Sequence, residues 1–340
     1  MGDALKNLRS GLIVTRTPLR ISFAGGGTDL PNFYEHQPGA VLSTTINKYV
    51  YVTIKRHGDL FNEKYRINYS ETEQAFELDS IKNEITRECL KFLNIQPPLY
   101  VSTVGDLPAF SGLGSSSSFA VGLLNALHIY CGERVSAGQL AQEACHIEIE
   151  VLKHPIGKQD QYAAAFGGLN FFTFLSDGGV TIEPHRMPDG GQTRLFGHLM
   201  MFWTNIQRDA NSVLREQKNN TVSKMGHLSQ MRDHAEKLRT MIMNRDFNVV
   251  EFGGLLDETW GLKRGLASTI TNDQIDAWYE KAKKAGASGG KLLGAGGGGF
   301  LLLIVEPDRQ DAVRAAVSDM TETHVAYESQ GSSLLFPSVD

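Results

Sequence analysis

The 340-residue sequence predicts an α+β protein that is built from two domains. Patterns typical of strands and of helices are interleaved in both halves of the chain. A run rich in glycine and proline, Met187-Pro188-Asp189-Gly190-Gly191, separates the halves and is the best linker in the chain. We therefore expect an N-terminal domain at residues 1–190 and a C-terminal domain at residues 191–340.

The first half is expected to contain most of the strands, which are runs of β-branched and aromatic residues. Pro18 is expected to split the first of them, and Pro97-Pro98 to stop a helix. A hairpin is expected through Ser176-Asp177-Gly178-Gly179. The expected strands are 12–17, 19–24, 41–46, 49–54, 66–69, 75–78, 99–104, 169–174 and 180–183, and the expected helices are 81–92, 118–130 and 136–152.

The second half is expected to be mainly helical, because its apolar residues recur with helical spacing. The apolar run 301–305 predicts a buried strand directly after a glycine-rich stretch. The expected helices are 209–219, 223–245, 249–264, 271–285 and 309–320, and the expected strands are 195–203, 301–305, 323–327 and 333–336.

A loop rich in glycine and serine, residues 108–118, leads into a helix that is apolar on nearly every side. Such a helix is buried, and the free N–H groups and the dipole at its N-terminus favour an anion. The alternative is a flexible linker, but a linker is usually followed by a new domain. Two further glycine-rich loops, residues 25–29 and 286–299, suggest a cleft that closes around a polyphosphate.

Glu148 stands out in the helix that Ser136 opens, where Gln139 completes the pattern of a capping box. At about 100° per residue, Glu148 is the only charge within the apolar arc. A buried ionised carboxylate must be paired or must bind a metal. The alternative is a glutamate at the edge of the arc that reaches solvent. The apolar arc consists of Leu140, Ala141, Ala144, Cys145, Ile147, Val151 and Leu152.

Composition and charge exclude several classes of function. The net charge of −5 and the lack of a basic block argue against a nucleic-acid partner. No apolar run of 18 residues occurs, and the N-terminus lacks the apolar core of a signal peptide, so no membrane partner is expected. The three cysteines have no metal-ligand spacing, which fits a cytoplasmic protein. The oligomeric state is not determined, and a homodimer is left open.

Common nucleotide motifs do not match. A Walker A loop requires Ser or Thr after Gly-Lys, but Leu292 follows Gly290-Lys291. A dinucleotide fingerprint requires a third glycine where Ser117 stands.

The three glycine-rich loops instead resemble the motifs of the GHMP kinases. Pro108 and the run Gly112-Leu113-Gly114-Ser115-Ser116 are similar to the central ATP-binding motif of that superfamily. Residues 18–29 resemble its first motif, and residues 291–299 resemble its third, in the same order along the chain. The resemblance implies a two-domain fold with the active-site cleft between the domains.

Residues 16–31 and 155–162 look like the sugar-kinase branch of that superfamily. The nearest subgroup is the bacterial D-glycero-D-manno-heptose 7-phosphate kinases. These enzymes phosphorylate the anomeric hydroxyl on the way to GDP-heptose for surface glycans. L-fucose kinases are near neighbours.

The resemblance implies ATP and Mg²⁺ as cofactors. Ser116 and Glu148 match the positions that bind the metal. The ATP-binding residues that it implies are Pro108, Ser111, Gly112, Leu113, Gly114, Ser115, Ser116 and Ser117.

Asp160 resembles the proposed catalytic base of galactokinase, and Arg20 resembles a cation that bridges this base and the transferring phosphoryl group. From position alone, Asp160 is equally well a helix cap, and Arg20 is a surface residue of a strand. Homoserine-kinase-like members work without an obvious base, so the destination of the proton stays open.

The substrate-binding residues are also implied by the resemblance. Asp29 matches an acid that binds sugar hydroxyls, and a substrate that already carries a phosphate needs cations. Lys158 and Arg208 rank first for that phosphate, ahead of Lys48 and Lys291, although each is more often a surface charge. The expected set is Gly26, Gly27, Thr28, Asp29, Lys158, Gln159, Arg208, Gly296, Gly297 and Gly298.

The sequence thus predicts a kinase of the C1 hydroxyl of heptose 7-phosphate. One alternative is an L-fucose or galactose kinase. Another is a non-catalytic sensor of sugar and ATP, which typically lacks a motif residue, whereas Arg20, Ser116, Glu148 and Asp160 are all present.

Overall fold

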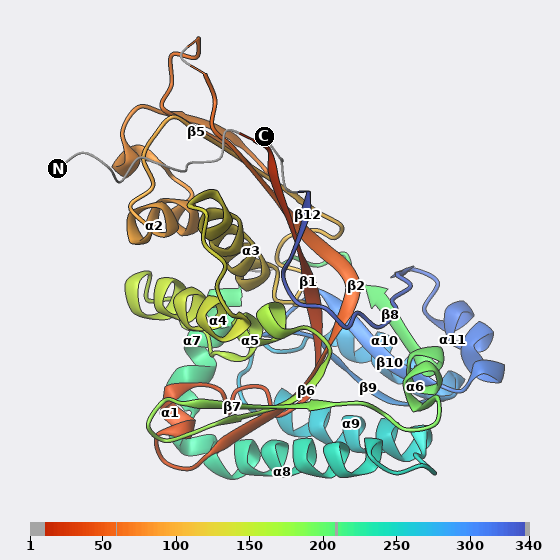
Figure 1. The fold of residues 1–340 in the computed structure, drawn as a ribbon. Helices are drawn as coiled ribbons and strands as arrows, with labels where there is room; N and C mark the ends of the chain where they lie inside the picture. Colours follow the sequence, from red (N-terminus) through yellow and green to blue (C-terminus); the bar gives the residue numbers. More distant parts are fainter. Residues whose placement is uncertain (1–10, 59, 208–209, 337–340) are drawn as a thin grey trace.

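The computed structural model describes residues 11–58, 60–207 and 210–336, whose strands form two sheets. In the eight-stranded sheet the order is β12-β1-β2-β5-β3-β4, and β6 pairs with β2 and β7 (Figure 1). The four-stranded sheet has the order β11-β8-β10-β9. The strands are β1 (Ile13–Ala24), β2 (Gly39–Lys55), β3 (Tyr65–Asn68), β4 (Thr72–Ala75), β5 (Leu99–Gly105), β6 (Leu169–Phe174), β7 (Val180–His185), β8 (Leu199–Trp203), β9 (Ala287–Leu292), β10 (Phe300–Val305), β11 (Thr321–Glu322) and β12 (Ser333–Phe336).

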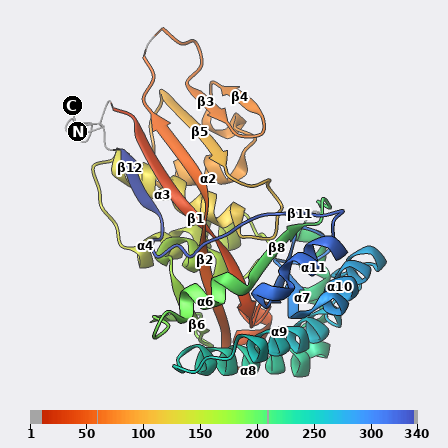
Figure 2. The ribbon, with the colours of Figure 1, turned by 90° about the vertical axis from the view of Figure 1, so that its right-hand side faces the viewer.

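The helices pack in groups around these sheets. In Figure 1, α2 to α5 gather on one side of β1 and β2, whereas α8 and α9 run along the lower edge. Figure 2 shows α10 and α11 beside the smaller sheet. α9 packs on β9 and β10, whereas α8 packs on β1 and β2. The helices are α1 (Pro31–Tyr34), α2 (Glu84–Phe92), α3 (Ser115–Tyr130), α4 (Ala137–Cys145), α5 (Gln159–Phe166), α6 (Gly191–His198), α7 (Ala210–Asn220), α8 (Met225–Ile242), α9 (Val249–Arg264), α10 (Asp273–Ala285) and α11 (Gln310–Ala316).

The two longest strands, β1 and β2, are each continuous, although the sequence predicted a pair of shorter strands in both places. Pro18 does not break β1, because the register between β1 and β2 shifts at this residue as in a β-bulge. On the other edge of β1, β12 pairs only with residues 14–16, so no hydrogen bond to Pro18 is required there. β1 and β2 therefore pair along their length as one long antiparallel ribbon.

Four other expectations about strands were wrong. The strand expected at 75–78 is displaced, because β4 covers Thr72–Ala75 and a 3-10 turn begins at Leu78. Residues 195–198 belong to α6, because an apolar run alone does not distinguish a buried helix from a strand. Residues 287–292 form β9 although this stretch is rich in glycine. A Cβ atom on Gly289 would lie 1.9 Å from the carbonyl oxygen of Gly253 in α9, so the glycine permits close packing of helix on sheet. Residues 323–327 are not a strand, and β11 covers only Thr321–Glu322.

A single buried apolar cluster contains residues from both halves of the chain. Phe23 of β1 packs edge to face on Phe252 of α9, with ring centroids 5.2 Å apart. The boundary expected at residue 190 coincides with the start of α6, and its position stays a prediction.

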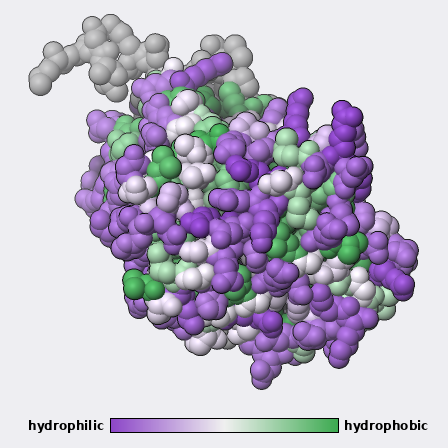
Figure 3. Space-filling model, turned by 90° about the horizontal axis from the view of Figure 1, so that it is seen from below, coloured by the Kyte–Doolittle hydropathy of each residue, from purple (hydrophilic) through white to green (hydrophobic). Residues whose placement is uncertain are grey.

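The molecular surface that includes α8 is largely hydrophilic, with apolar residues scattered singly (Figure 3). Among the described residues, no helix has the length and apolar character needed to cross a membrane.

A buried histidine, His128 of α3, ties α3 to α4. Its Nδ1 lies 2.7 Å from Glu133 and its Nε2 lies 2.7 Å from Glu143. Burial by itself lowers the pKa of His128, but the hydrogen bonds to both carboxylates outweigh it and hold the pKa above 6.5. Both ring nitrogens face acceptors, so the charged ring is the form that satisfies them.

We expect His128→Gln to destabilise the protein by roughly 1.5–3 kcal/mol at about pH 6 and by less at about pH 9. The folded pKa is raised, so the stabilisation is complete below the unfolded value of 6.5 and is lost as the pH rises through the folded value. Urea unfolding of both proteins at the two pH values measures this difference. The exposed His36→Gln is the control, and an equal loss of stability at both pH values would contradict the prediction.

Candidate active site

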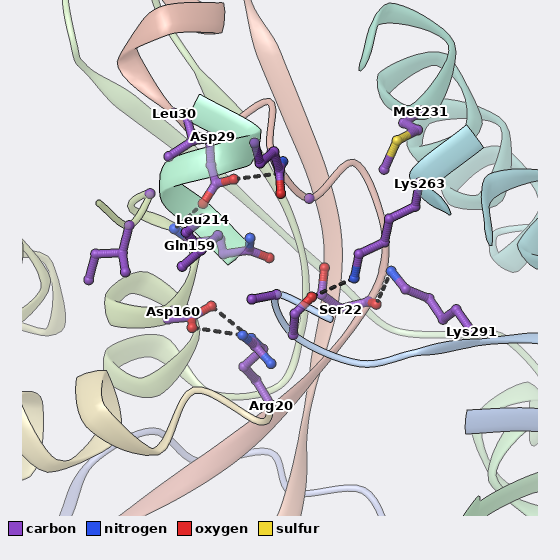
Figure 4. Close-up of a pocket in the computed structure, with 17 residues that line it drawn as sticks. Arg20, Ser22, Asp29, Leu30, Gln159, Asp160, Leu214, Met231, Lys263 and Lys291 are labelled. Carbon is purple, nitrogen blue, oxygen red and sulfur yellow. Dashed lines mark hydrogen bonds and ion pairs between the residues drawn. The ribbon is translucent and has the colours of Figure 1, made fainter. Parts of the chain in front are cut away.

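One pocket lies where β1, the first turn of α5, helices α7 to α9 and the loop after β9 meet. Figure 4 shows Asp29, Gln159 and Asp160 on one side of this pocket and Lys263 and Lys291 on the other. Segments that are far apart in the sequence therefore contribute polar groups to one place.

Arg20 and Asp160 form a bidentate ion pair at this pocket (Figure 4). Arg20 Nε and Nη2 each donate to one carboxylate oxygen of Asp160, both at 2.7 Å. Arg20 Nη1 also donates to the carbonyl oxygen of Gly112 at 2.7 Å. Arg20 is 5% exposed, so its long side chain is held in one position that joins β1, α5 and the glycine–serine loop.

Gly114, within the glycine–serine loop 108–118, is the N-cap of α3 and has left-handed backbone angles, so residues 115–118 already belong to the helix. No side chain caps this helix, so its first N–H groups have no intrahelical or capping acceptor. A Cβ atom on Gly112 would lie 2.6 Å from the carbonyl oxygen of Leu293, and one on Gly294 would lie 2.4 Å from the Cα of Gly112. The central loop and the third glycine-rich loop are therefore in direct backbone contact.

Glu148 is fully buried, as the helical arc predicted, but it lies in a π-helical turn, His146–Val151, that follows α4. Ser116 Oγ donates to Glu148 Oε1 at 2.6 Å, and Gln161 Nε2 donates to Oε2 at 2.7 Å. Burial raises the pKa of Glu148, although these hydrogen bonds oppose it. Widened turns of this kind occur frequently at functional sites.

The oxygen atoms of Ser116 and Glu148 are suited to Mg²⁺, which prefers oxygen ligands and is usually bound by one or two carboxylates together with substrate phosphates. The buried carboxylate receives its hydrogen bonds from uncharged groups, so a cation beside it would supply the missing counter-charge. Within the described residues, no group of three or more His, Cys, Asp or Glu could hold a metal by itself.

Asp29 follows β1 in a tight turn and is 2% exposed. Its carboxylate accepts from the backbone N–H of Gly27 at 2.9 Å and from that of Gln159 at 3.3 Å. Burial, and then the charge of Asp160, raise the pKa of Asp29. The acid is thus fixed next to Asp160 on the wall of the pocket.

Two buried lysines also line the pocket. Lys291, one of the candidates expected more often at the surface, is 3% exposed and donates to the carbonyl oxygens of Ser22 and Phe23. Lys263 of α9 was not identified from the sequence, and it donates to the carbonyl oxygens of Leu292 and Gly294. Burial, followed by the charge of Arg20, lowers the pKa of Lys263 to about 7.

A usable signal for Lys263 was present in the sequence. The buried face of α9 consists of Val249, Phe252, Gly253, Leu256, Thr259, Trp260 and Lys263. Lys263 is the only charge on that face, just as Glu148 is the only charge within its apolar arc.

Several expected substrate residues lie elsewhere. Lys158 does not line the pocket, because its ammonium donates to the carbonyl oxygen of Gly178 at 2.6 Å and lies over the ring of Tyr34. Lys48 is also absent from the pocket wall. Arg208 lies outside the described residues.

Of the expected substrate residues in the first and third motifs and in α5, some line the pocket and others do not. Gly26, Gly27 and Gln159 line the pocket, whereas the hydroxyl of Thr28 donates to the carbonyl oxygen of Gly25 within the turn. Gly296 and Gly298 pack against the backbones of Ile270 and Ile206, and the N–H of Gly297 donates to the carbonyl oxygen of Ile270. None of the three lines the pocket. They shape the loop, while Gly294 and Ala295 face the pocket.

Comparison with known proteins identifies the family. Residues 81–168 match the GHMP kinases N terminal domain, and residues 243–322 match the GHMP kinases C terminal domain. A D-glycero-alpha-D-manno-heptose 7-phosphate kinase from Campylobacter jejuni is 31% identical over 310 residues, which cover 88% of this chain and 91% of that protein.

Two further relatives extend the comparison. An L-fucokinase/L-fucose-1-P guanylyltransferase from Bacteroides fragilis is 28% identical over 88% of this chain and 35% of its own length. The crystal structure of a D-glycero-D-manno-heptose 1-phosphate kinase from Bacteroides thetaiotaomicron superposes with a TM-score of 0.79 at 24% identity, covering 96% of this chain and all of that one. The chain therefore belongs to the GHMP kinases, and it is an ATP-dependent sugar kinase of that family.

Proposed function

We propose that the chain transfers the γ-phosphoryl group of ATP to the anomeric (C1) hydroxyl of D-glycero-D-manno-heptose 7-phosphate, giving the 1,7-bisphosphate. The observation that carries this proposal is the Arg20–Asp160 pair, which lies between Asp29 and the uncapped N-terminus of α3. The similarity to the Campylobacter jejuni heptose 7-phosphate kinase supports this choice of sugar. The product would supply the synthesis of GDP-heptose for surface polysaccharides.

Asp160 is the group that accepts the proton of the sugar hydroxyl. A bond forms between that oxygen and the γ-phosphorus, the bond from the γ-phosphorus to the β,γ-bridging oxygen breaks, and ADP leaves. Arg20 holds the Asp160 carboxylate by two hydrogen bonds and adds positive charge beside the phosphoryl group. The free N–H groups at the start of α3 receive the phosphates of ATP.

Ser116 and Glu148 are the residues that would hold Mg²⁺. The ion would neutralise phosphate charge as the transfer proceeds. Asp29, held by two backbone N–H groups, has oxygen lone pairs left for the hydroxyls of the sugar.

An L-fucose kinase is the second candidate, because the Bacteroides fragilis bifunctional enzyme is 28% identical to this chain. Fucose carries no phosphate, so the two candidates differ in whether the pocket must accommodate a second anionic group.

The role of Asp160 as the base is tested by Asp160→Asn. This change removes the proton acceptor and keeps the size of the side chain, so we expect kcat to fall at least about 100-fold. Steady-state kinetics with heptose 7-phosphate and ATP measure this change, and Asp273→Asn, at an exposed acid of α10, is the control. If Asp160→Asn retained the wild-type kcat, Asp160 would not be the base.

At Glu148, activity and stability should respond differently to substitution. Glu148→Gln removes a negative charge that binding of Mg²⁺ needs, so kcat should fall about 100-fold or more. The same change removes a buried charge whose pKa is already raised, so Tm should not decrease. Kinetics over a range of Mg²⁺ concentrations and a thermal melt measure the two effects. Wild-type kcat, or a loss of activity that follows a loss of Tm, would count against the metal role.

The choice of substrate is tested by comparing three sugars. The value of kcat/KM should be highest for D-glycero-D-manno-heptose 7-phosphate and at least about 100-fold lower for L-fucose and D-galactose, which lack the anionic group. A coupled assay for ADP with all three sugars measures the ratios. Efficient turnover of a free sugar alone would replace heptose 7-phosphate with that sugar.

A further inference from the structure

Two ammonium groups, those of Lys263 and Lys291, approach the pocket from the side opposite Asp160 (Figure 4). Both residues are more than nine-tenths buried, at 7% and 3% exposed. Each ammonium donates to two main-chain carbonyl oxygens. A lysine has three N–H donors, so each of these groups retains one for a ligand.

Neither lysine forms an ion pair with a carboxylate within the part of the chain that the structure describes. Asp160 is occupied by Arg20 through two hydrogen bonds. Burial and the neighbouring cations lower the pKa of both lysines. Buried charge without a counter-charge is costly, so an anion that enters here gains a favourable interaction with both groups.

A third polar group, the Ser22 hydroxyl, faces the same pocket. Ser22 lies on β1 and is 7% exposed, and its Oγ is a buried atom without a hydrogen-bond partner. An unsatisfied buried hydroxyl calls for an explanation, and a bound ligand provides one. The backbone carbonyl of Ser22 accepts from Lys291 at 2.9 Å, so the hydroxyl and that ammonium lie close together.

The pocket that contains these groups is also lined by Asp29, Gln159 and Asp160, but by no residue of the glycine–serine loop 108–118. The free donors therefore share the pocket with the groups assigned to the sugar and with the Arg20–Asp160 pair, whereas the loop assigned to the ATP phosphates does not line it. This position favours an anion that is part of the acceptor.

We propose that Ser22, Lys263 and Lys291 form the subsite for the phosphate group that the sugar already carries before the reaction. This inference rests on the proposed function and names residues that select a phosphorylated acceptor over a free one. A neutral sugar would leave the two ammonium groups without a counter-charge and the Ser22 hydroxyl without a hydrogen bond. The free energy lost at these unpaired groups makes a neutral sugar a poorer substrate than a phosphorylated one.

The kinetic test uses Lys263→Met and Ser22→Ala. Lys263→Met replaces the ammonium group and its charge with an apolar side chain. Ser22→Ala removes only a hydroxyl that makes no hydrogen bond within the protein. We expect kcat/KM for heptose 7-phosphate to fall about 10–100-fold in Lys263→Met and about 3–10-fold in Ser22→Ala. The KM for ATP, and kcat/KM for the same heptose without its phosphate, should change less than about 2-fold.

Arg264→Met is the matched control, because Arg264 is the next residue of α9 and pairs with Asp276 instead of lining the pocket. This change should leave kcat/KM for both heptose 7-phosphate and the free heptose unchanged. If Lys263→Met lost activity equally on the phosphorylated and the free heptose, Lys263 would serve the phosphoryl group of ATP and the proposal would be wrong.

A binding test without ATP separates this inference from the proposed function. Thermal melts are recorded with heptose 7-phosphate and with the free heptose, each at the same concentration. The sugar phosphate should raise Tm of the wild type and of Arg264→Met, and should raise it less in Lys263→Met and Ser22→Ala. Equal shifts in all four proteins would overturn the subsite even if the enzyme is active. If the wild type turned over neither sugar, the proposed reaction would fail while these shifts still decide the subsite.

Discussion

The ion pair between Arg20 and Asp160 is the contact on which the rest of the site depends. Arg20 belongs to β1 and Asp160 to α5, and the remaining donor of the guanidinium reaches the carbonyl oxygen of Gly112. One buried side chain thus fixes the relative positions of a strand, a helix and a loop. Because a guanidinium is planar, two of its nitrogens bind the two carboxylate oxygens side by side while the third reaches the carbonyl oxygen, and an ammonium offers no such fork.

Close packing of backbone on backbone also fixes the positions of segments from the second half of the chain. Gly112 meets Leu293 and Gly294, and Gly289 meets Gly253 of α9. These contacts exclude any side chain at the glycines, so they bring α9 and β9 close to the site. Lys263 and Lys291 come from these two elements, and their position in the pocket follows from that packing.

Periodicity and motif order were sufficient to predict the fold class and most elements from the sequence. Glu148 could be predicted as buried because its place on a helix decides its environment. The same rule applies to Lys263, whose position on the buried face of α9 was overlooked. The direction of Lys158 could not be predicted, because a flexible side chain next to a motif can turn either way.

Long-range strand pairing also could not be predicted from the sequence. The continuity of β1 through Pro18 depends on a shift in register against β2 and on the fact that β12 pairs only with residues 14–16. No local sequence pattern contains this information. Likewise, the glycines at 296–298 resemble a ligand-binding loop, but their neighbours are protein backbone, and a glycine does not say which kind of group approaches it.

The π-helical turn at His146–Val151 makes this segment sensitive to chain length. A widened turn holds one residue more than an α-helical turn of similar rise. Deleting His146 or Ile147 would restore a regular helix and change the direction in which Glu148 projects from it. Glu148 would then leave the face that it shares with Ser116, even if every side chain of the site were retained. The position of the carboxylate at the expected metal site therefore depends on the number of residues in this turn as well as on their identity.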